Sequence, residues 1–255
     1  MSDTFSVADK VVVITGAGQG IGRSFAKSFA SAGARVVIAE RNVEKAHAVA
    51  QEIASGNGHA EVVETDVADA DSVAAMGASV ERMFGRADVL INNAAIFSTL
   101  EMQPFDQISL AEWERVLRVN VTGPFLCARA LLPLMRRNKW GRIINMASGA
   151  VTLGRPNYLH YIASKAALEG MTHSMARELG PDGITVNAIL PGATYTEIAR
   201  KTVTPEQKER IVAMQCIPRS QIPDDLIGVG LFLASDASAF MTGQSLTVDG
   251  GATHP

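Results

Sequence analysis

Residues 11–31, VVVITGAGQGIGRSFAKSFAS, decide the fold of this chain. An apolar, β-branched run at 11–14 predicts a strand, and a helix is expected at 23–31. Between them lies a turn, 15–22, that contains four glycines. Residues without Cβ allow unusual dihedral angles and let backbone N–H groups and the helix N-terminus approach a pyrophosphate. This order of strand, turn and helix favours a phosphate-binding unit over a glycine-rich turn without a ligand.

The spacing of the glycines indicates which type of glycine-rich turn this is. Gly16, Gly20 and Gly22 form the pattern GxxxGxG. The common dinucleotide pattern GxGxxG is not met, because Ile21 and Arg23 stand where its third glycine would have to be. The turn is therefore of the dinucleotide-binding kind, with its own spacing.

The same alternation of short apolar runs and longer amphipathic stretches continues along the chain, which predicts repeated βαβ units. The expected strands are 11–14, 35–39, 60–64, 88–91, 142–146, 185–189 and 245–248. Continuous apolar runs are typical of parallel strands covered on both faces. We therefore expect a single α/β domain, 1–255, with a Rossmann-type doubly wound sheet of about seven strands and ligands at the carboxyl ends of the strands.

Composition argues against several other classes of protein. The chain has 23 basic and 26 acidic residues, a net charge of −3 that gives no footprint for nucleic acid. Cys127 and Cys216 lie far apart and form no CxxC pair, and the five histidines show no metal-ligand spacing. We expect no metal, no membrane span and, without an apolar leader, a cytoplasmic protein.

The end of the second expected strand bears on the choice of cofactor. Glu40 lies 18 residues beyond Gly22, where a carboxylate can accept hydrogen bonds from the adenosine ribose and would repel a 2′-phosphate. Arg41 beside it could instead pair with that phosphate or stack on adenine, or it could simply be solvated. Gln19 adds no positive charge to the turn. These residues favour NAD over NADP.

A tyrosine and a lysine on one helix suggest acid–base chemistry. Tyr161 and Lys165 are spaced i, i+4, so their side chains share one face. A nearby ammonium stabilises a phenolate and lowers the tyrosine pKa from its usual value of about 10. Tyr158 is about 10.5 Å from Lys165 along the helix axis, too far for contact. Alone, such a pair is more often a solvated or packing pair.

Two further residues support the pair. Ser148 follows the strand expected at 142–146, at the sheet edge where a substrate oxygen should lie, although it could equally cap a turn or helix. Asn120 is expected inside a long helix that begins at Ser109. Because Pro124 has no N–H, the Asn120 carbonyl must find another donor, such as a water that could relay protons to Lys165. The plain alternative is a kinked helix.

These residues resemble the short-chain dehydrogenase/reductase family in its single-domain branch. The resemblance covers essentially the whole chain and rests on the turn 15–22, Asn92-Asn-Ala-Ala95, Asn120, Ser148, Tyr161-Ile-Ala-Ser-Lys165, Pro191-Gly192 with Thr196, and the segment 242–251. Within the family, His160-Tyr161-Ile162 and Ile217-Pro218-Arg219 are similar to secondary-alcohol dehydrogenases of the 1-phenylethanol type, although carrier-protein reductases and sugar dehydrogenases share most of them.

The resemblance implies a role for each catalytic residue. Tyr161 is the proton donor or acceptor, and Lys165 lowers its pKa and holds the nicotinamide ribose. Ser148 hydrogen-bonds the substrate oxygen, and Asn120 anchors the relay water. Other implied cofactor contacts are Asp66 and Val67 at adenine, Asn92 and Ala94 at the adenosine ribose, and Pro191, Gly192, Thr194 and Thr196 at the carboxamide. The family also implies a homotetramer.

The segment 194–222 is expected to close over the substrate as a lid. Apolar walls are expected from Phe97, Val151, Leu153, Tyr158 and Tyr195, which suit a small hydrophobic or aromatic alcohol, although ordinary packing explains each of them as well. The lack of an Arg or Lys cluster in this segment disfavours an acyl-carrier substrate.

The predicted activity is hydride transfer between NAD(H) and a secondary alcohol or ketone. A 3-oxoacyl-carrier-protein or sugar reductase is the alternative within the family. A dinucleotide sensor without turnover would not need Asn120, Ser148, Tyr161 and Lys165 together, and a nucleotide-sugar epimerase would need a further domain.

Overall fold

A seven-stranded parallel sheet forms the centre of the computed structural model, which describes residues 4–199 and 204–254. The strands are β1 (Val11–Thr15), β2 (Arg35–Glu40), β3 (His59–Glu64), β4 (Val89–Asn92), β5 (Gly141–Met146), β6 (Ile184–Pro191) and β7 (Ser245–Val248). Their order is β3-β2-β1-β4-β5-β6-β7, and every neighbouring pair is parallel. Each predicted strand is present, with ends that differ by no more than two residues.

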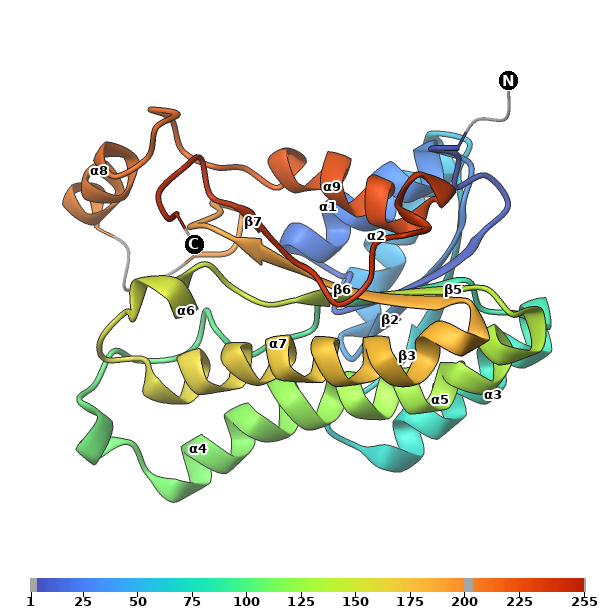
Figure 1. Cartoon of the computed structure of the whole chain (residues 1–255), viewed down its shortest axis with the longest axis horizontal. Coiled ribbons are helices and arrows are strands. Elements are labelled where there is room, and N and C mark those ends of the chain that lie inside the picture. The colour runs from blue at the N-terminus through green and yellow to red at the C-terminus, as the bar shows by residue number, and fades with distance from the viewer. Residues whose placement is uncertain (1–3, 200–203, 255) are drawn as a thin grey trace.

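Helices cover both faces of this sheet (Figure 1). One face carries α1 (Gly20–Ser31), α2 (Val43–Ser55) and α9 (Asp224–Ala234), and the other carries α3 (Ala70–Phe84), α5 (Gly123–Asn138) and α7 (Leu159–Leu179). The shorter helices are α4 (Leu110–Leu117), α6 (Ala150–Leu153) and α8 (Pro205–Ala213). Short 3-10 turns lie at Phe105–Gln107, Gly180–Asp182 and Asp236–Ser238. The predicted doubly wound, single-domain α/β fold is confirmed.

Alternation along β1 explains why both layers pack tightly. Val12 and Ile14 belong to the cluster under α1 and α9, whereas Val11 and Val13 belong to the cluster under α3 and α5. Successive strand side chains point to opposite faces, so a run of apolar residues supplies both cores. The result is a rigid sheet that fixes where its carboxyl ends meet.

Two predicted helices differ from what the structure shows. Helix α1 begins at Gly20 rather than at residue 23, with Gln19 as its N-cap, so the last glycines of the turn already belong to the first turn of the helix. The long helix expected from Ser109 is interrupted by a π-helical turn, Arg118–Thr122, in which the Gly123 N–H donates to the Arg118 carbonyl five residues back. Pro124 cannot donate to Asn120, so the ladder shifts to wider spacing just there.

No helix in the described part of the chain is both long and apolar enough to cross a membrane.

Candidate active site

A cavity of about 1090 Å³ lies at the carboxyl edge of the sheet. It is larger than the roughly 300–1,000 Å³ of an ordinary ligand site, which leaves room for a dinucleotide and a substrate together. Most of the residues predicted from the sequence line it, namely Gly16, Gln19, Ile21, Glu40, Arg41, Asp66, Val67, Ala94, Ser148, Tyr161, Lys165, Pro191, Gly192, Thr194 and Thr196. Gly20, Gly22, Asn92 and Asn120 lie outside this lining.

The glycine turn is packed too closely for side chains. Gly16 has φ +66°, and a Cβ there would lie 2.8 Å from the Ala94 Cα. A Cβ on Gly22 would overlap the Gly16 carbonyl oxygen and lie 2.5 Å from the Asn93 Nδ2. These contacts bring the backbone of the turn against the segment after β4 and leave its outer side to the cavity. The turn fits a phosphate group for the reason that the sequence suggested.

One contact at the turn has no signal in the sequence. The Gly20 N–H donates to the Glu197 Oε1 over 2.8 Å, although 177 residues separate the two. The carboxylate thereby satisfies a donor at the N-terminus of α1, a position that attracts anions. Pattern reasoning could not find this contact, because only the folded chain brings the segment after β6 to α1.

Glu40 and Arg41 line the cavity at the carboxyl end of β2, where the sequence predicts the adenosine, and this region is called the adenosine end. The two oxygens of Glu40 accept hydrogen bonds from the Gly18 N–H (3.1 Å) and the Asn42 N–H (2.9 Å). Arg41 lies 3.6 Å from the Asp66 carboxylate, an exposed pair that contributes little stability. Backbone donors therefore orient the Glu40 carboxylate at this end.

Asn92 does not occupy the place that the family resemblance implied. It is buried, and its Nδ2 donates to the Asn145 Oδ1 over 2.9 Å. Asn92 ends β4 on the same face as Leu90, which packs against the helices rather than toward the cavity. Asn93, the next residue, lines the cavity and donates from Nδ2 to the Thr15 and Gly16 carbonyl oxygens.

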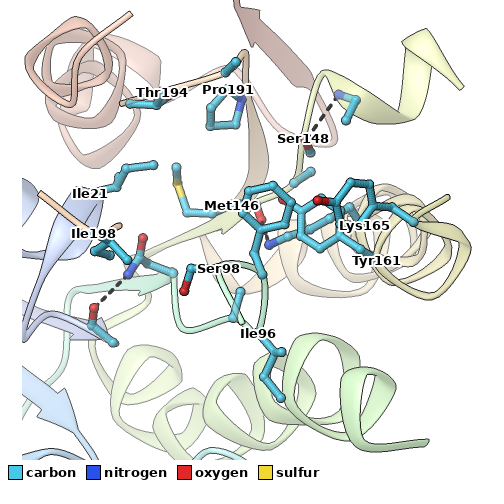
Figure 2. Close-up of a pocket in the computed structure, with 18 of the residues that line it drawn as sticks. Ile21, Ile96, Ser98, Met146, Ser148, Tyr161, Lys165, Pro191, Thr194 and Ile198 are labelled. Carbon is cyan, nitrogen blue, oxygen red and sulfur yellow. Dashed lines mark hydrogen bonds between the residues drawn. The ribbon is translucent and has the colours of Figure 1, made fainter. Parts of the chain in front are cut away.

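Tyr161 and Lys165 lie next to each other in the cavity wall (Figure 2). The Lys165 Nζ lies 5.8 Å from the centre of the Tyr161 ring and donates to the Met146 carbonyl oxygen over 2.6 Å. Burial lowers the pKa of the Lys165 ammonium to about 8. The helix register thus places an amine of altered acidity beside a phenol, as the i, i+4 spacing predicted. Tyr158, only 1% exposed, packs its ring against Phe97.

Ser148 also lines the cavity, just beyond the end of β5. Its Oγ accepts a hydrogen bond from the Ala150 N–H over 3.2 Å, drawn as a dashed line in Figure 2. The serine therefore caps the turn into α6, the plain role that the sequence allowed. Its hydroxyl hydrogen can still donate to a ligand.

Asn120 acts through its side chain as a brace between segments. Its Oδ1 accepts from the Ile96 N–H over 2.8 Å, and its Nδ2 donates to the Ser164 Oγ over 3.0 Å. Ser164 in turn donates to the Tyr161 carbonyl oxygen over 2.7 Å. Asn120 thus ties the segment after β4 to the helix turn that carries Tyr161. It lies in the π-helical turn, where the sequence predicted the lost donor to the Asn120 carbonyl but not the π-helical turn itself.

The substrate end of the cavity is only partly as expected. Phe97, Leu153 and Tyr158 line it, whereas Val151 and Tyr195 do not. Ile211 and Met214, on the helix of the expected lid, also line this end, together with Met102, Arg155, Gln207 and Arg210, which sequence reasoning missed. The two arginines bring positive charge to an end where the sequence analysis expected no Arg or Lys cluster. Within 4–199 and 204–254, no three His, Cys, Asp or Glu side chains gather as metal ligands. Residues 200–203 of the expected lid, 194–222, lie outside the described residues.

Comparison with known proteins agrees with this geometry. A family model described as Enoyl-(Acyl carrier protein) reductase matches residues 16–253. A probable galactose dehydrogenase of Rhizobium meliloti is 38% identical over 95% of this chain and 94% of its own. A 3-oxoacyl-[acyl-carrier-protein] reductase of Synechocystis is 38% identical over 95% and 96%.

A solved structure of a gluconate 5-dehydrogenase from Burkholderia cenocepacia, in complex with NADP and tartrate, is 35% identical to this chain. The two superpose with a TM-score of 0.92 over 98% of this chain and 97% of the other. The likeness therefore extends over nearly the whole length of both chains. The chain belongs to the short-chain dehydrogenase/reductase family of oxidoreductases.

Proposed function

We propose that this protein transfers a hydride between NAD(H) and a secondary alcohol or ketone. The observation that carries the proposal is one continuous cavity that joins the glycine turn to Tyr161, Lys165 and Ser148. A phosphate-binding turn without a reactive side chain would suit a sensor. A phenol beside a buried amine at the other end of the same cavity supports turnover.

The chain's own residues would divide the work as follows. Tyr161 donates a proton to the carbonyl oxygen in reduction and accepts it in oxidation, and Ser148 donates a hydrogen bond to the same oxygen. Lys165 stabilises the phenolate of Tyr161 by its positive charge. Asn120 positions Tyr161 through Ser164. When bound, the nicotinamide supplies the hydride chemistry.

The cofactor residues fit a dinucleotide because Gly16 and Gly22 leave no room for Cβ atoms and hold the turn open to the cavity. NAD is favoured over NADP because backbone N–H groups hold the Glu40 carboxylate at the adenosine end, where it would repel a 2′-phosphate. Arg41 and Lys45 provide positive charge nearby: Lys45 donates from Nζ to the Gln19 Oε1 over 2.5 Å. NADP is the alternative cofactor, since the similar gluconate 5-dehydrogenase binds it.

A reductase or dehydrogenase that acts on sugars or on 3-oxoacyl carrier proteins is the second candidate, since relatives bear those names. Incubation with NAD(H) and NADP(H) against secondary alcohols, ketones, sugars and 3-oxoacyl thioesters, followed by nicotinamide absorbance, separates the candidates. We expect turnover with a secondary alcohol or ketone. Turnover of sugars or thioesters alone would select the second candidate, and none with any class would favour a sensor.

Assembly as a homotetramer, a cytoplasmic location and closure of 194–222 as a lid remain predictions.

A further inference from the structure

Two arginines at the substrate end of the cavity form no ion pair with any residue that the structure describes. Arg155 and Arg210 both line it. The ion pairs of the described residues include the lining arginines Arg41, with Asp66, and Arg115, with Glu112, but neither Arg155 nor Arg210. Positive charge at the edge of a cavity, with no acid to neutralise it, is suited to an anionic ligand.

Arg155 lies just after helix α6, the short helix that follows Ser148. Helix α6 has only four residues and ends at Gly154, whose φ of +58° reverses the chain. The Arg155 N–H then donates to the Ala150 carbonyl oxygen over 3.4 Å. Only the four-residue helix α6 and its reversal at Gly154 therefore separate Arg155 from the segment of the predicted substrate-binding serine.

A row of rings connects Arg155 to Tyr161. The guanidinium carbon lies 4.9 Å from the centre of the Tyr158 ring. Tyr158 contacts Phe97, and Phe97 contacts Tyr161, with ring centroids 5.8 Å and 4.5 Å apart. Stacking uses the face of a guanidinium and leaves the N–H groups on its edge available for a planar, two-oxygen group such as a carboxylate.

Helix α8 contributes the second arginine. Gln207, Arg210, Ile211 and Met214 line the cavity at the spacing i, i+3, i+4, i+7, so one face of this helix is turned to it. Figure 1 shows α8 and α6 at the same end of the molecule, beyond β6. Asp249, the acid that lines this end, is already occupied, since its oxygens accept hydrogen bonds from Gly251, Ala252 and Thr253.

Large apolar side chains contribute to the cavity lining beside the arginines and the catalytic residues. Met102, Leu153 and Met214 line the cavity and are 37%, 48% and 50% exposed. Large apolar side chains exposed in a cavity are available to cover the apolar part of a ligand.

Resting on the proposed function, we propose that Arg155, assisted by Arg210, binds a carboxylate of the substrate, so that the substrates are oxo acids and hydroxy acids with an apolar body. The carbonyl carbon lies at Tyr161 and Ser148, the apolar body along the Met102 and Leu153 walls, and the carboxylate at the guanidinium. Arg155 then sets specificity, with no part in the proton transfer.

The test compares an acid with its neutral ester. Aryl ketones whose ring separates the carbonyl from a carboxylate, such as 3-(4-acetylphenyl)propanoate, and their methyl esters are reduced with NADH by wild type, Arg155→Gln and Arg210→Gln. We expect wild type to prefer the acid by about tenfold in kcat/KM, the equivalent of one charge-assisted contact. Arg155→Gln should lower kcat/KM for the acid about tenfold more than for the ester, mainly through KM, with a smaller effect for Arg210→Gln.

The control is Arg82→Gln, which removes the same charge from the exposed end of α3, outside the cavity lining. Equal losses for acid and ester in Arg155→Gln, or no preference in wild type, would overturn the proposal.

Binding of the acid to the NADH complex, measured by calorimetry, gives a second readout independent of turnover. Binding that is lost in Arg155→Gln, without reduction of either ketone, would support the carboxylate site and overturn the proposed function. Reduction of the ester without binding of the acid would support the proposed function and overturn the carboxylate site.

Discussion

At the glycine-turn end of the cavity the backbone itself forms the wall, whereas at the end beyond α6 and α8 the wall consists of exposed side chains. Gly16 and Gly22 have no space for a Cβ, while Leu153 and Met214 are about half exposed. Backbone constraints tolerate few residue types and therefore leave a pattern in the sequence. Side-chain walls tolerate many residue types, so the glycine-turn end of the cavity can be predicted from the sequence, whereas the lining of the other end cannot.

The largest expected effect comes from a substitution in the glycine turn. In Gly22→Ala the new methyl group meets the Gly16 carbonyl oxygen and the Asn93 amide, both held in place, so we expect a loss of about 3 kcal/mol of stability or failure to fold. Urea unfolding and NADH binding measure it.

The matched variant is Gly228→Ala in α9, where nothing lies within 4 Å of the added methyl group. It should gain about 0.5–1 kcal/mol, because alanine favours a helix over glycine. Similar stabilities for the two variants would show that the turn is not close-packed.

The next effect concerns the buried amine between the two ends. Lys165 titrates near 10.5 in the unfolded chain and near 8 in the folded one, so between these values the unfolded state binds more protons and wild-type stability rises with pH. Lys165→Met removes this dependence. As the pH rises from about 7 to about 10, the free energy of unfolding of wild type should therefore increase by about 2 kcal/mol more than that of Lys165→Met.

Urea denaturation of both proteins across that range measures the difference. A difference that stays constant with pH would mean that the amine keeps its ordinary pKa in the folded protein.

A smaller effect sharpens the choice of cofactor. Glu40→Ser removes the carboxylate at the adenosine end and should lower the preference for NAD over NADP, taken as the ratio of kcat/KM values, about tenfold. Glu64→Ser is the control, since Glu64 pairs with Glu40 across β2 and β3 but does not line the cavity. An unchanged ratio in Glu40→Ser would assign the choice to Arg41 or another group.

Sequence periodicity was sufficient for the sheet and for the helix register of Tyr161 and Lys165, because both depend on local spacing. The resemblance was not sufficient to place Asn92. Successive side chains of a strand point to opposite faces, and this alternation turns Asn92 away from the cavity and toward Asn145. The contact of Glu197 with Gly20 and the approach of Arg155 to Tyr158 depend on segments that only the folded chain brings together.

Removal of the Tyr161 hydroxyl group tests the central claim, acid–base chemistry by this residue, most directly. Tyr161→Phe keeps the ring that packs on Phe97 and removes only the hydroxyl. We predict that turnover of a secondary alcohol falls about 10²–10⁴-fold, while NADH still quenches protein fluorescence as in wild type. A variant that retains a tenth or more of wild-type turnover would contradict the account.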